Sequence, residues 1–421
     1  MKKVMLKTTL TLSISLATSQ LFAAGFALNE QSVSGMGTGF AGRSSSADDA
    51  STVYGNPAGM SRLKREQFTV GAAGVFAKTD IDNASGSAAG SNDGDMVPVV
   101  GVPMGYYVKP IDDHWAVGFG VYVPFGLKTE YENDFQGRYF AHDSKVQVIT
   151  LQPTVSYAFN DTVSIGGGPT FNRIDGTLSS ALPNPFGGAD GEAKIKGDDV
   201  AVGYNIGIMV QATDKTRLGL TYHSKVDYKL KGSTKVDLGA LNPLLGSRDY
   251  DAKLNIQTPE TVDASFTHEL NDQWTLYGGS TWTRWSRLKS ITVQNSGNFG
   301  VIGEANFGTI NEDQNWHDTW AHAIGAAYKV NKEWTLRTGF TIDQAPTNNT
   351  DRSPRIPTGD RKIVSFGAGW SPTENMTIDV AYSYLREDEA KIRSASASRG
   401  TYSADYRNTA HGLGSSITYR F

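Results

Sequence analysis

Two features near the start of the chain carry residue types that could perform chemistry. Asp48 and Asp49 are adjacent carboxylates, which general acid–base catalysis could use. Residues 37–42 have the glycine spacing G-x-G-x-x-G of a dinucleotide-binding turn, but no predicted strand precedes them and no βαβ unit surrounds them. A tight glycine turn is therefore the better interpretation of this motif. We expect the two carboxylates to cap turns or to pair with a cation such as Arg43.

The other residue types that catalysis and metal binding use form no pattern. The seven histidines are scattered, and only His317 and His322 lie near each other, so neither a metal site nor a catalytic triad emerges. Cysteine is absent, which excludes disulfides, a thiol nucleophile and thiolate metal ligands. The formal charge of −4 gives no reason to expect a nucleic acid as a partner. We therefore expect neither an enzyme nor a cofactor or metal site.

The first 23 residues have the three parts of a secretory signal peptide. Three lysines within the first seven residues are followed by an apolar run, Thr8 to Phe22, and by small residues at 23–25. A helix needs ~20 residues to span a bilayer, and this run is shorter. The alternative is a short buried helix at the N-terminus. We expect residues 1–23 to be a cleaved signal peptide, which makes the protein an exported one.

From about residue 68 onward the hydrophobic pattern has a period of two. The stretch 335–343, for example, places Leu336, Phe340 and Ile342 on one face and charged or small residues on the other. One apolar and one polar face per strand suits either a soluble sandwich or a membrane barrel. The predicted strands cover residues 68–77, 98–109, 114–131, 139–159, 162–178, 194–212, 216–230, 252–269, 273–292, 318–330, 333–345, 361–371, 376–390 and 405–421.

The connections between these fourteen predicted strands decide between the two folds. Six tight turns alternate strictly with seven long loops, which is the pattern of an outer-membrane barrel, whereas a sandwich has no reason to segregate loop lengths. The last strand ends on Phe421, which resembles the assembly signal of bacterial outer-membrane proteins. Several tryptophans near strand ends suit an interfacial girdle: Trp115, Trp274, Trp320, Trp334 and Trp370. We predict an all-β, fourteen-stranded antiparallel transmembrane β-barrel over residues 67–421, monomeric, in the outer membrane of a Gram-negative bacterium.

The segment before the first strand, residues 24–66, is not part of the predicted wall. It is rich in glycine, serine and alanine and contains the turn Asn56-Pro57-Ala58. A barrel of fourteen strands leaves a channel unless something fills its lumen. We therefore expect residues 24–66 to form an N-terminal plug, or hatch, inside the barrel.

The same segment carries a family resemblance. It resembles the N-terminal signature of the FadL family of outer-membrane transporters for long-chain fatty acids and other hydrophobic compounds, most densely at Gly25-Phe26, residues 28–30, residues 47–50 and Asn56-Pro57-Ala58. The resemblance implies passive diffusion of apolar ligands through a barrel with a hatch. In that reading Phe26, Asn56, Pro57 and Ala58 belong to the gate. The expected ligand is a long-chain fatty acid, and the alternative is a small aromatic or aliphatic hydrocarbon.

The family releases its ligand sideways, through a gap at a kinked third strand. The third predicted strand contains Pro124-Phe125-Gly126, where proline cannot donate a ladder hydrogen bond and glycine weakens the strand. An ordinary bulge near the rim is the alternative. A lateral route suits a fatty acid because each buried methylene of its tail gains roughly 0.8 kcal/mol, so direct release into lipid avoids contact with water.

Outside the barrel, apolar residues in two predicted loops are costly unless they pack or bind something. The family uses the corresponding loops as a ligand-capturing groove, and the alternative is a lid in which the loops pack on each other. The groove residues are Leu182, Phe186, Leu238, Leu241, Leu244 and Leu245. Inside, a carboxylate head group would need a cation, for which Arg173, Arg287 and Lys289 are candidates by position. Outer-membrane lipid and lipopolysaccharide are expected partners of the outer wall.

Overall fold

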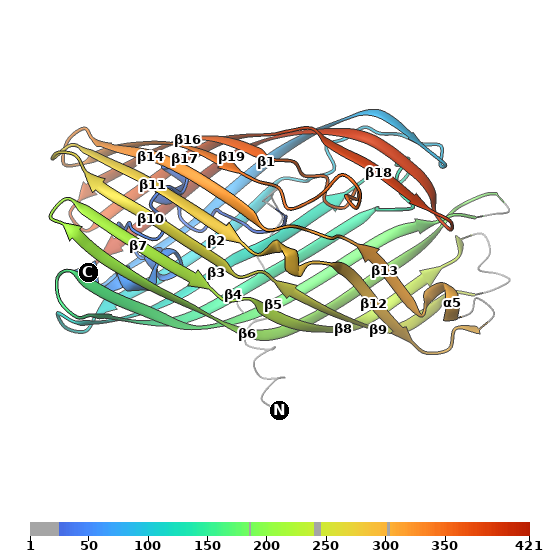
Figure 1. Ribbon diagram of the computed structural model, residues 1–421, viewed down its shortest axis with the longest axis horizontal. Helices are drawn as coiled ribbons and strands as arrows, with labels where there is room; N and C mark the ends of the chain where they lie inside the picture. The colour runs from blue at the N-terminus through green and yellow to red at the C-terminus, as the bar shows by residue number, and fades with distance from the viewer. Residues whose placement is uncertain (1–24, 185–186, 240–245, 301–303) are drawn as a thin grey trace.

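The wall strands close on themselves in the computed structural model, which describes residues 25–184, 187–239, 246–300 and 304–421 (Figure 1). Strand β1 (Gln67–Gly86) pairs antiparallel with both β2 (Val100–Pro110) and β19 (Gly400–Arg420), so first and last strands meet. Closure leaves no exposed sheet edge, which is what a β-structure needs in a bilayer. The predicted signal peptide, residues 1–23, lies outside the described residues.

The described residues form one sheet of nineteen strands, five of which continue a preceding strand after a short break. Counting each broken strand once leaves fourteen wall strands, which confirms the predicted number. The unbroken ones are β1, β2, β3 (Trp115–Glu130), β4 (Asp143–Ala158), β5 (Val163–Leu182), β6 (Gly191–Thr213), β15 (Trp334–Asp343), β16 (Arg361–Thr373) and β19. The broken ones are β7 (Thr216–His223) with β8 (Val226–Asp237), β9 (Arg248–Thr258) with β10 (Thr261–Glu269), β11 (Trp274–Thr283) with β12 (Ser290–Ser296), β13 (Thr309–Asp313) with β14 (Thr319–Lys329), and β17 (Met376–Glu387) with β18 (Ala390–Ser396).

The two faces of the wall have opposite character. On β6, Val202, Tyr204 and Ile206 are exposed on the outside, whereas Asn205 and Met209 between and beside them are buried inside. The five tryptophans expected in the girdle are all exposed on the outer surface. This alternation is the apolar-out, polar-in pattern of a transmembrane barrel.

Several strands extend beyond their predicted ends. β1 continues to Gly86, and β13 and β18 lie in stretches expected to be loops. Their sequences are polar, so the hydrophobic pattern did not mark them as membrane strands. They form because the hairpin ladders continue past the apolar band: β12 pairs with β13, and β18 with β19. The sheet is therefore taller on the side of the long loops.

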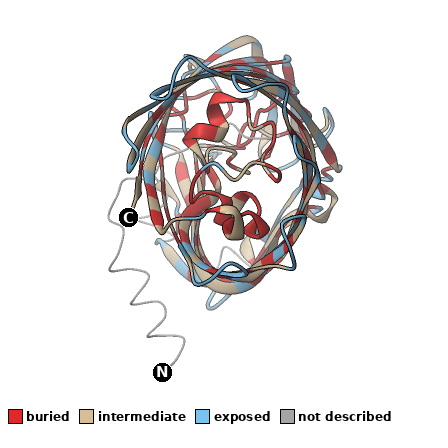
Figure 2. Cartoon of the chain, turned by 90° about the vertical axis from the view of Figure 1, so that its left-hand side faces the viewer, coloured by how far each residue is buried: buried red, intermediate tan, exposed pale blue. Residues whose placement is uncertain are grey.

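The segment before β1 lies inside the barrel (Figure 2). It contains two short helices, α2 (Val33–Gly37) and α3 (Thr52–Gly55), and the 3₁₀ helix η1 (Pro57–Arg62). None of the helices in the described part of the chain is long and apolar enough to cross a membrane. We call residues 25–66 the plug.

Glycines on the inner face of the wall make room for the plug. A Cβ atom at Gly207 on β6 would collide with Oδ1 of Asn56, and one at Gly219 on β7 would collide with the Ser44 carbonyl. The missing side chains let plug backbone approach the wall directly. Ser44 then donates from Oγ to the Gly219 carbonyl at 3.0 Å. The plug is seated by close fit and hydrogen bonds rather than by a hydrophobic interface alone.

Candidate functional site

The third wall strand leaves the barrel ladder at the position where proline and glycine predicted a break. β2 and β3 pair only up to Gly105 opposite Val121, and the register of β3 against β4 shifts between Tyr122 and Phe125. Beyond Val121, no described residue of β2 pairs with β3. A proline here costs little, because its missing N–H removes no ladder bond.

Beyond the break, β3 pairs with the start of the plug instead. The amide of Leu28 donates to the Pro124 carbonyl at 2.8 Å, and the amide of Gly126 donates to the Phe26 carbonyl at 2.8 Å. Ala27 and Phe125 form the antiparallel bridge between these two bonds. The plug therefore satisfies backbone groups that β2 leaves unpaired, which a buried strand requires.

The side chain of Phe26 lies in an aromatic cluster across the lumen. Phe26 is 4% exposed, and its ring centroid lies 5.0 Å from Trp285, 5.7 Å from Phe125 and 6.0 Å from Trp316. Trp285 belongs to the 3₁₀ helix η3 (Trp285–Arg287) between β11 and β12. These edge-to-face and tilted contacts are the favourable geometry for aromatic rings. Together the four rings form a partition, which we name the aromatic partition.

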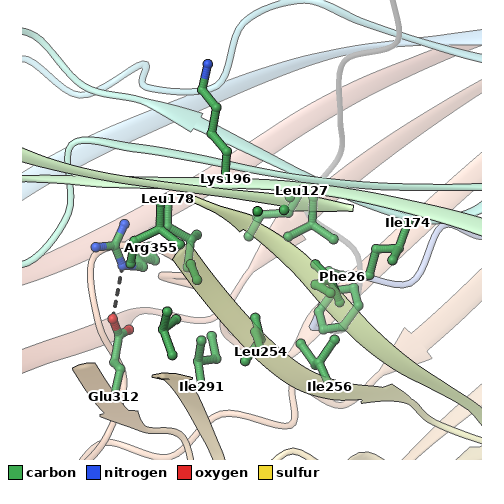
Figure 3. A pocket seen from close by; sticks show the side chains of 18 of the residues that line it. Phe26, Leu127, Ile174, Leu178, Lys196, Leu254, Ile256, Ile291, Glu312 and Arg355 are labelled. Carbon is green, nitrogen blue, oxygen red and sulfur yellow. Dashed lines mark hydrogen bonds and ion pairs between the residues drawn. The ribbon is translucent and has the colours of Figure 1, made fainter. Parts of the chain in front are cut away.

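One side of the aromatic partition is an apolar cavity of about 820 Å³ (Figure 3). Phe26 and Leu288 line it at the partition. Most of its other apolar side chains come from strands of the wall, among them Leu127, Val146, Ile174, Leu178, Leu254 and Ile256. The lining is almost entirely apolar, as in sites that bind hydrophobic ligands.

The wall of this cavity is thinned by a row of glycines. Gly176 on β5 pairs with Gly197 on β6, which in turn pairs with Gly232 on β8, and all three line the cavity. A Cβ atom at Gly176 would meet only ordinary contacts, so glycine leaves space there. A Cβ atom at Gly232 would collide with the Lys196 carbonyl, so glycine there allows β6 and β8 to approach each other.

A buried ion pair lies at the polar end of the cavity. Nε of Arg355 lies 3.0 Å from Oε2 of Glu312, and Nη1 of Arg355 donates to Ser144 Oγ and to the carbonyls of Asp143 and Ser179. No described residue hydrogen bonds to Nη2. Arg355 comes from the stretch 346–360, which the sequence assigns to an external loop but which folds against the lumen. Nη2 therefore has hydrogen-bonding capacity that no described residue uses.

The other side of the aromatic partition is a second cavity of about 770 Å³, with a mixed polar and apolar lining, that borders Pro124 and Phe125. Arg43 of the plug reaches it, with Nη2 donating to Asn29 Oδ1 at 2.8 Å and the guanidinium 5.2 Å from the Phe40 ring. Arg43 does not pair with the acidic residues expected for it. Asp49 instead caps a turn, accepting from Ser34 Oγ at 2.6 Å and from the amide of Ser51 at 2.8 Å.

The Asn56-Pro57-Ala58 turn lies away from the partition and is fastened to the wall. Asn56 is fully buried, and its side chain donates to the carbonyls of Ser44 at 2.6 Å and Ile208 at 3.0 Å while accepting from the Ala58 amide. The Ala58 carbonyl accepts from Ser164 Oγ at 2.9 Å. The four residues expected in the gate thus occupy two places: Phe26 at the partition, and the turn at an anchor.

A buried carboxylate lies next to the segment that meets β3. Oε2 of Glu30 is buried without a hydrogen-bond partner among the described residues. Burial raises the pKa of Glu30, and the positive charges of Arg361 and Arg43 oppose this shift without cancelling it. The plug therefore contains a group whose protonation favours its docked position.

The three cations expected to face a head group do not line either cavity. Arg173 lies on the outer face of β5, because its chain neighbours Asn172 and Ile174 point inward. It pairs with Asp198 at 3.7 Å. Arg287 forms two hydrogen bonds with Glu260, and Lys289 is exposed. These expectations are corrected by the structure because strand parity turns Arg173 outward and because Glu260 occupies Arg287.

The sequence did not mark Arg355, Trp285 or Trp316. The two tryptophans lie at breaks in alternating strands, where no period assigns a face. Their position away from the strand ends, where girdle tryptophans are expected, was the one feature of the sequence that could have marked them as lumen residues.

The external groove falls partly outside the described residues. Phe186, Leu241, Leu244 and Leu245 are among the residues that are not described. Leu182, at the end of β5, and Leu238, after β8, are half-buried and do not line the apolar cavity. The groove stays a prediction.

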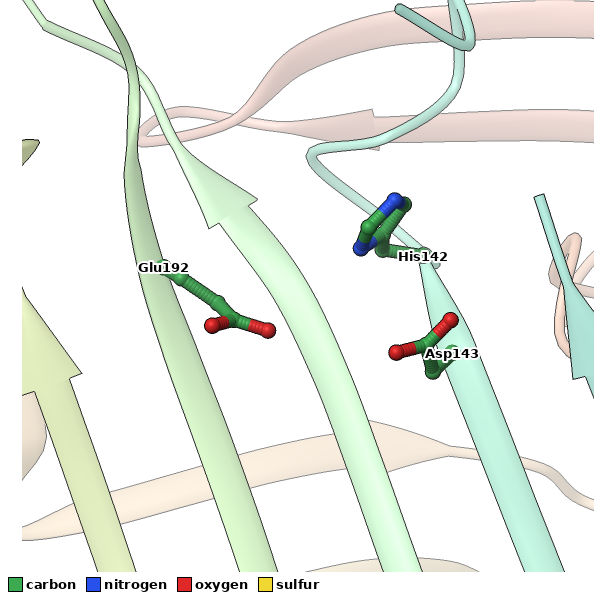
Figure 4. Close-up of side chains that lie close together, drawn as sticks. All are labelled: His142, Asp143 and Glu192. Carbon is green, nitrogen blue, oxygen red and sulfur yellow. The ribbon is translucent and has the colours of Figure 1, made fainter. Parts of the chain in front are cut away.

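Three side chains that could ligate a metal lie together near the outer end of β4 and β6 (Figure 4). One ligand atom from each of His142, Asp143 and Glu192 lies within 4.8 Å of the others. Nε2 of His142 is buried without a hydrogen-bond partner among the described residues, whereas a metal-bound histidine ordinarily donates its second ring N–H. The cluster alone therefore specifies no metal.

Comparison with known proteins agrees with this architecture. Residues 14–421 match the family described as Outer membrane protein transport protein (OMPP1/FadL/TodX). The Long-chain fatty acid transport protein of Escherichia coli O6:H1 is 28% identical over 452 residues, covering 100% of this chain and 99% of the relative. Outer membrane protein P1 of Haemophilus influenzae is 29% identical over 423 residues, with 88% of this chain and 89% of the relative covered.

Two solved structures are similar as well. The crystal structure of a Pseudomonas aeruginosa FadL homologue superimposes with a TM-score of 0.83 at 28% identity, covering 94% of this chain and all of that one. The Ralstonia pickettii toluene transporter TbuX, at 20% identity and a TM-score of 0.65 over 88% of this chain and 94% of that one, shares the fold. From the match over nearly its whole length, we conclude that the chain belongs to the OMPP1/FadL/TodX family of outer-membrane transporters, which are non-enzymatic channels for hydrophobic compounds.

Proposed function

We propose that this protein is a passive channel for long-chain fatty acids. The observation that carries the proposal is the apolar cavity with one arginine nitrogen, Nη2 of Arg355, free of described partners at its polar end. An alkyl tail would lie among the apolar side chains, and the carboxylate would accept from Nη2. The Escherichia coli relative named for long-chain fatty acid transport supports this choice.

The proposed route continues from the cavity past Phe26 towards the break in β3. Phe26 lines the apolar cavity, and its neighbours Ala27 and Leu28 line the second cavity, which borders Pro124 and Phe125. A shift of this short segment would join the two cavities and free the inner edge of β3 together. Each methylene kept out of water is worth roughly 0.8 kcal/mol, so lateral release into lipid is favoured over release into the periplasm.

A second candidate is a channel for small aromatic or aliphatic hydrocarbons. It is favoured by the ion pair between Arg355 and Glu312, which neutralises the arginine before any ligand arrives. An uncharged ligand would then need no head-group site. The two candidates therefore differ in whether uptake of the ligand requires Arg355.

The deciding experiment replaces the pair without leaving a buried charge. In cells without another such transporter, Arg355→Gln with Glu312→Gln should lower uptake of labelled oleate at least tenfold and leave labelled toluene uptake unchanged. Arg352→Gln is the matched control, because Arg352 lies in the same loop and hydrogen bonds to Thr347 and Asn349 instead. Unchanged oleate uptake in the double variant would reject the carboxylate role and favour the hydrocarbon channel.

A blocking substitution tests the cavity itself. A Cβ atom at Gly176 meets Leu230 at 3.6 Å and the carbonyls of Gly197 and Lys145 at 3.8 and 3.9 Å, all ordinary contact distances, so Gly176→Phe should direct its ring into the cavity. Uptake of either ligand should fall strongly. Gly105→Ala is the control, because a Cβ atom there meets nothing within 4 Å. Normal uptake in Gly176→Phe would show that the ligand travels elsewhere.

A further inference from the structure

The wall contains a second break in its ladder, between the strand formed by β9 with β10 and the strand formed by β11 with β12. The ladder between β10 and β11 ends where Thr261 lies opposite Thr283. The ladder between β9 and β12 resumes only where Leu254 lies opposite Val293. Between these two pairs, the described residues of the two strands form no ladder with each other. At about 3.3 Å per residue, the unpaired stretch of the first strand is roughly 20 Å long.

We name residues 255–260 and the facing residues 284–292 the second break. Its edges stay paired on their far sides, β9 with β8 and β12 with β13, so the rest of the barrel is closed around it. A backbone hydrogen bond crosses the second break, from the amide of Arg284 to the carbonyl of Glu260 at 3.0 Å. Opening the wall at a complete ladder would leave many backbone groups unpaired, whereas opening it here breaks mainly side-chain contacts.

The inner side of the second break is the apolar cavity. Ile256 on one edge and Leu288 and Ile291 on the other all line this cavity, and Figure 3 labels Ile256 and Ile291. Leu288 is buried in the hydrophobic cluster that contains Phe26, and Ile256 and Ile291 pack against that cluster. Packed apolar side chains therefore close the wall here, in place of a ladder.

The outer side of the second break is spanned by charged side chains. The carboxylate of Glu260, on one edge, lies 3.2 Å from Nη1 of Arg284 and accepts from Nη2 of Arg287 at 2.6 Å, and both arginines belong to the other edge. Glu260 faces outward, because its neighbour Thr261 lines the second cavity inside the barrel. Only 7% of the Glu260 side chain is exposed, whereas Arg284 is 47% exposed. We name these three charged residues the Glu260 bridge.

The Glu260 bridge lies where the apolar band of the outer wall ends. Along four neighbouring strands the band ends in a row of residues that lie opposite one another: Tyr222, Val262, Trp282 and Trp320. Tryptophan and tyrosine gather at the interface between membrane and water. The next outward positions are Glu260 and Arg284, so the second break begins at this interface, on the side of the long loops. Its further outward residues, such as Asn255 and Thr292, are polar.

This arrangement suits an amphiphile with an alkyl tail. In a bilayer such a molecule keeps its charged head at the interface, which is the level of the Glu260 bridge, whereas a hydrocarbon without a head group dissolves in the bilayer interior. The outer side of the second break is polar and its inner side is apolar, in the same order as the head and the tail. A tail that moves sideways from lipid into the apolar cavity stays out of water throughout, so it keeps its hydrophobic stabilisation.

We propose that the second break is a side entrance, through which a fatty acid dissolved in the outer leaflet passes its alkyl tail into the apolar cavity, and that the Glu260 bridge holds this entrance closed. The inference rests on the proposed function, from which it takes the fatty acid and the cavity. Arg284 is half-exposed, so water can replace its hydrogen bond when the bridge opens. Entry and release are then separate: the tail enters between β9 and β12 and leaves at the break in β3.

The entrance can be tested with a single thiol, because the chain has no cysteine. Ile291→Cys places the thiol on the inner side of the second break, and Met209→Cys is the control, since Met209 is a buried inner-face residue of β6 that does not line the apolar cavity. The full-length protein in liposomes is treated with a maleimide on a long alkyl chain, dissolved in the lipid, or with a charged maleimide in the water. The lipid-dissolved reagent should label Ile291→Cys at least tenfold faster than Met209→Cys. Equal rates at the two positions, or faster labelling of Ile291→Cys by the charged reagent, would overturn the proposal.

The Glu260 bridge is tested in the same single-cysteine protein. Glu260→Gln, Arg284→Gln and Arg287→Gln together remove the charges without leaving one of them buried and unpaired. Labelling by the lipid-dissolved reagent should become at least fivefold faster. Lys362→Gln with Asp388→Gln is the matched control, because it removes an exposed ion pair of 3.1 Å elsewhere and should leave the rate unchanged. An unchanged rate without the bridge, or an equal rise in the control, would overturn the proposal.

A third comparison separates this entrance from the break in β3. Pro124→Val with Gly126→Thr, added to the Ile291→Cys protein, should leave labelling by the lipid-dissolved reagent unchanged. A loss of labelling would show that the reagent enters at β3, and would overturn the proposal. The reagent carries no carboxylate and need not be transported, so labelling does not depend on fatty-acid uptake. Failure of the side entrance is therefore distinguishable from failure of the proposed function, which the oleate uptake of the Arg355 variant reports.

Discussion

The backbone of Gly126 is hydrogen bonded to the backbone of Phe26, with 2.8 Å between amide nitrogen and carbonyl oxygen. This single bond joins the kinked wall strand to the residue whose ring closes the lumen. A displacement of Phe26 that opens the aromatic partition must also break or carry this bond. Phe26 thus links closure of the lumen to the pairing of the kinked wall strand. The first two predictions test these two parts, the Phe26 ring and the break in β3.

Phe26→Ala should open the aromatic partition. Removal of a buried phenyl ring typically lowers the free energy of unfolding by about 3–5 kcal/mol. Here the lost contacts are those of Phe26 with Trp285 and Trp316. We expect higher single-channel conductance in planar bilayers and faster influx of a small hydrophilic dye into cells. Phe76→Ala, on the exposed outer face of β1, is the control and should change neither. A conductance equal to that of the unsubstituted protein would show that the ring does not close the route.

Restoring a regular third strand should impair uptake without unfolding the barrel. Pro124→Val together with Gly126→Thr returns an amide donor and a β-branched side chain, so β3 can continue its ladder towards β2. We expect oleate uptake to fall at least fivefold while the heat-modifiable mobility of the folded barrel is retained. Undiminished uptake would argue against release at this strand.

Asn56→Ala should loosen the plug from its anchor. The substitution removes three hydrogen bonds and leaves the carbonyls of Ser44 and Ile208 without their amide donor, at about 1–3 kcal/mol for each buried group left unsatisfied. We expect faster proteolysis within residues 25–66 and a greater sensitivity of cells to large antibiotics. Asn255→Ala, on the exposed face of β9, is the control. Unaltered proteolysis would show that the turn is not an anchor.

Plug docking should weaken as the pH rises. Burial raises the pKa of Glu30 above its ordinary value of 4.5 in the docked plug, and the pKa returns towards that value when the group is solvated. The docked plug therefore binds the proton more tightly than the undocked plug. The resulting stabilisation of the docked plug is complete below about pH 4.5 and is lost as the pH rises through the raised pKa of Glu30.

Hydrogen exchange of residues 25–66 measured between pH 4.5 and 8, corrected for intrinsic rates, provides the test of this pH dependence. Protection should decrease with pH in the unsubstituted protein and in Glu333→Gln, a control in an exposed turn. It should become independent of pH in Glu30→Gln. A slope that survives in Glu30→Gln would assign the pH dependence to another group.

Much of the barrel could be read from the sequence because a lipid-facing wall imposes a period of two that every strand must repeat. Leu336, Phe340 and Ile342 show it on a single strand, and the same rule located the ends of β4, β15 and β16 to within a few residues. The extensions β13 and β18 were missed because their outward residues are polar, although Ala390 and Ile392 of β18 are buried on the inside. Pro124 could be recognised because a missing N–H is a local property that no tertiary contact changes.

The functional residues likewise divide into those that the local sequence indicates and those that only the tertiary structure brings together. The residue types alone determined a strand alternation, a break at Pro124 and a segment too polar for the wall, since each follows from the covalent chemistry of nearby residues. Only the tertiary structure decided that Arg355 lines the cavity while Arg173 faces outward, and that Phe26 meets Trp285 and Trp316 from distant parts of the chain. The face on which a strand residue lies depends on bulges and register, and contacts across a lumen depend on closure of the whole barrel, so neither is written in any local stretch of sequence.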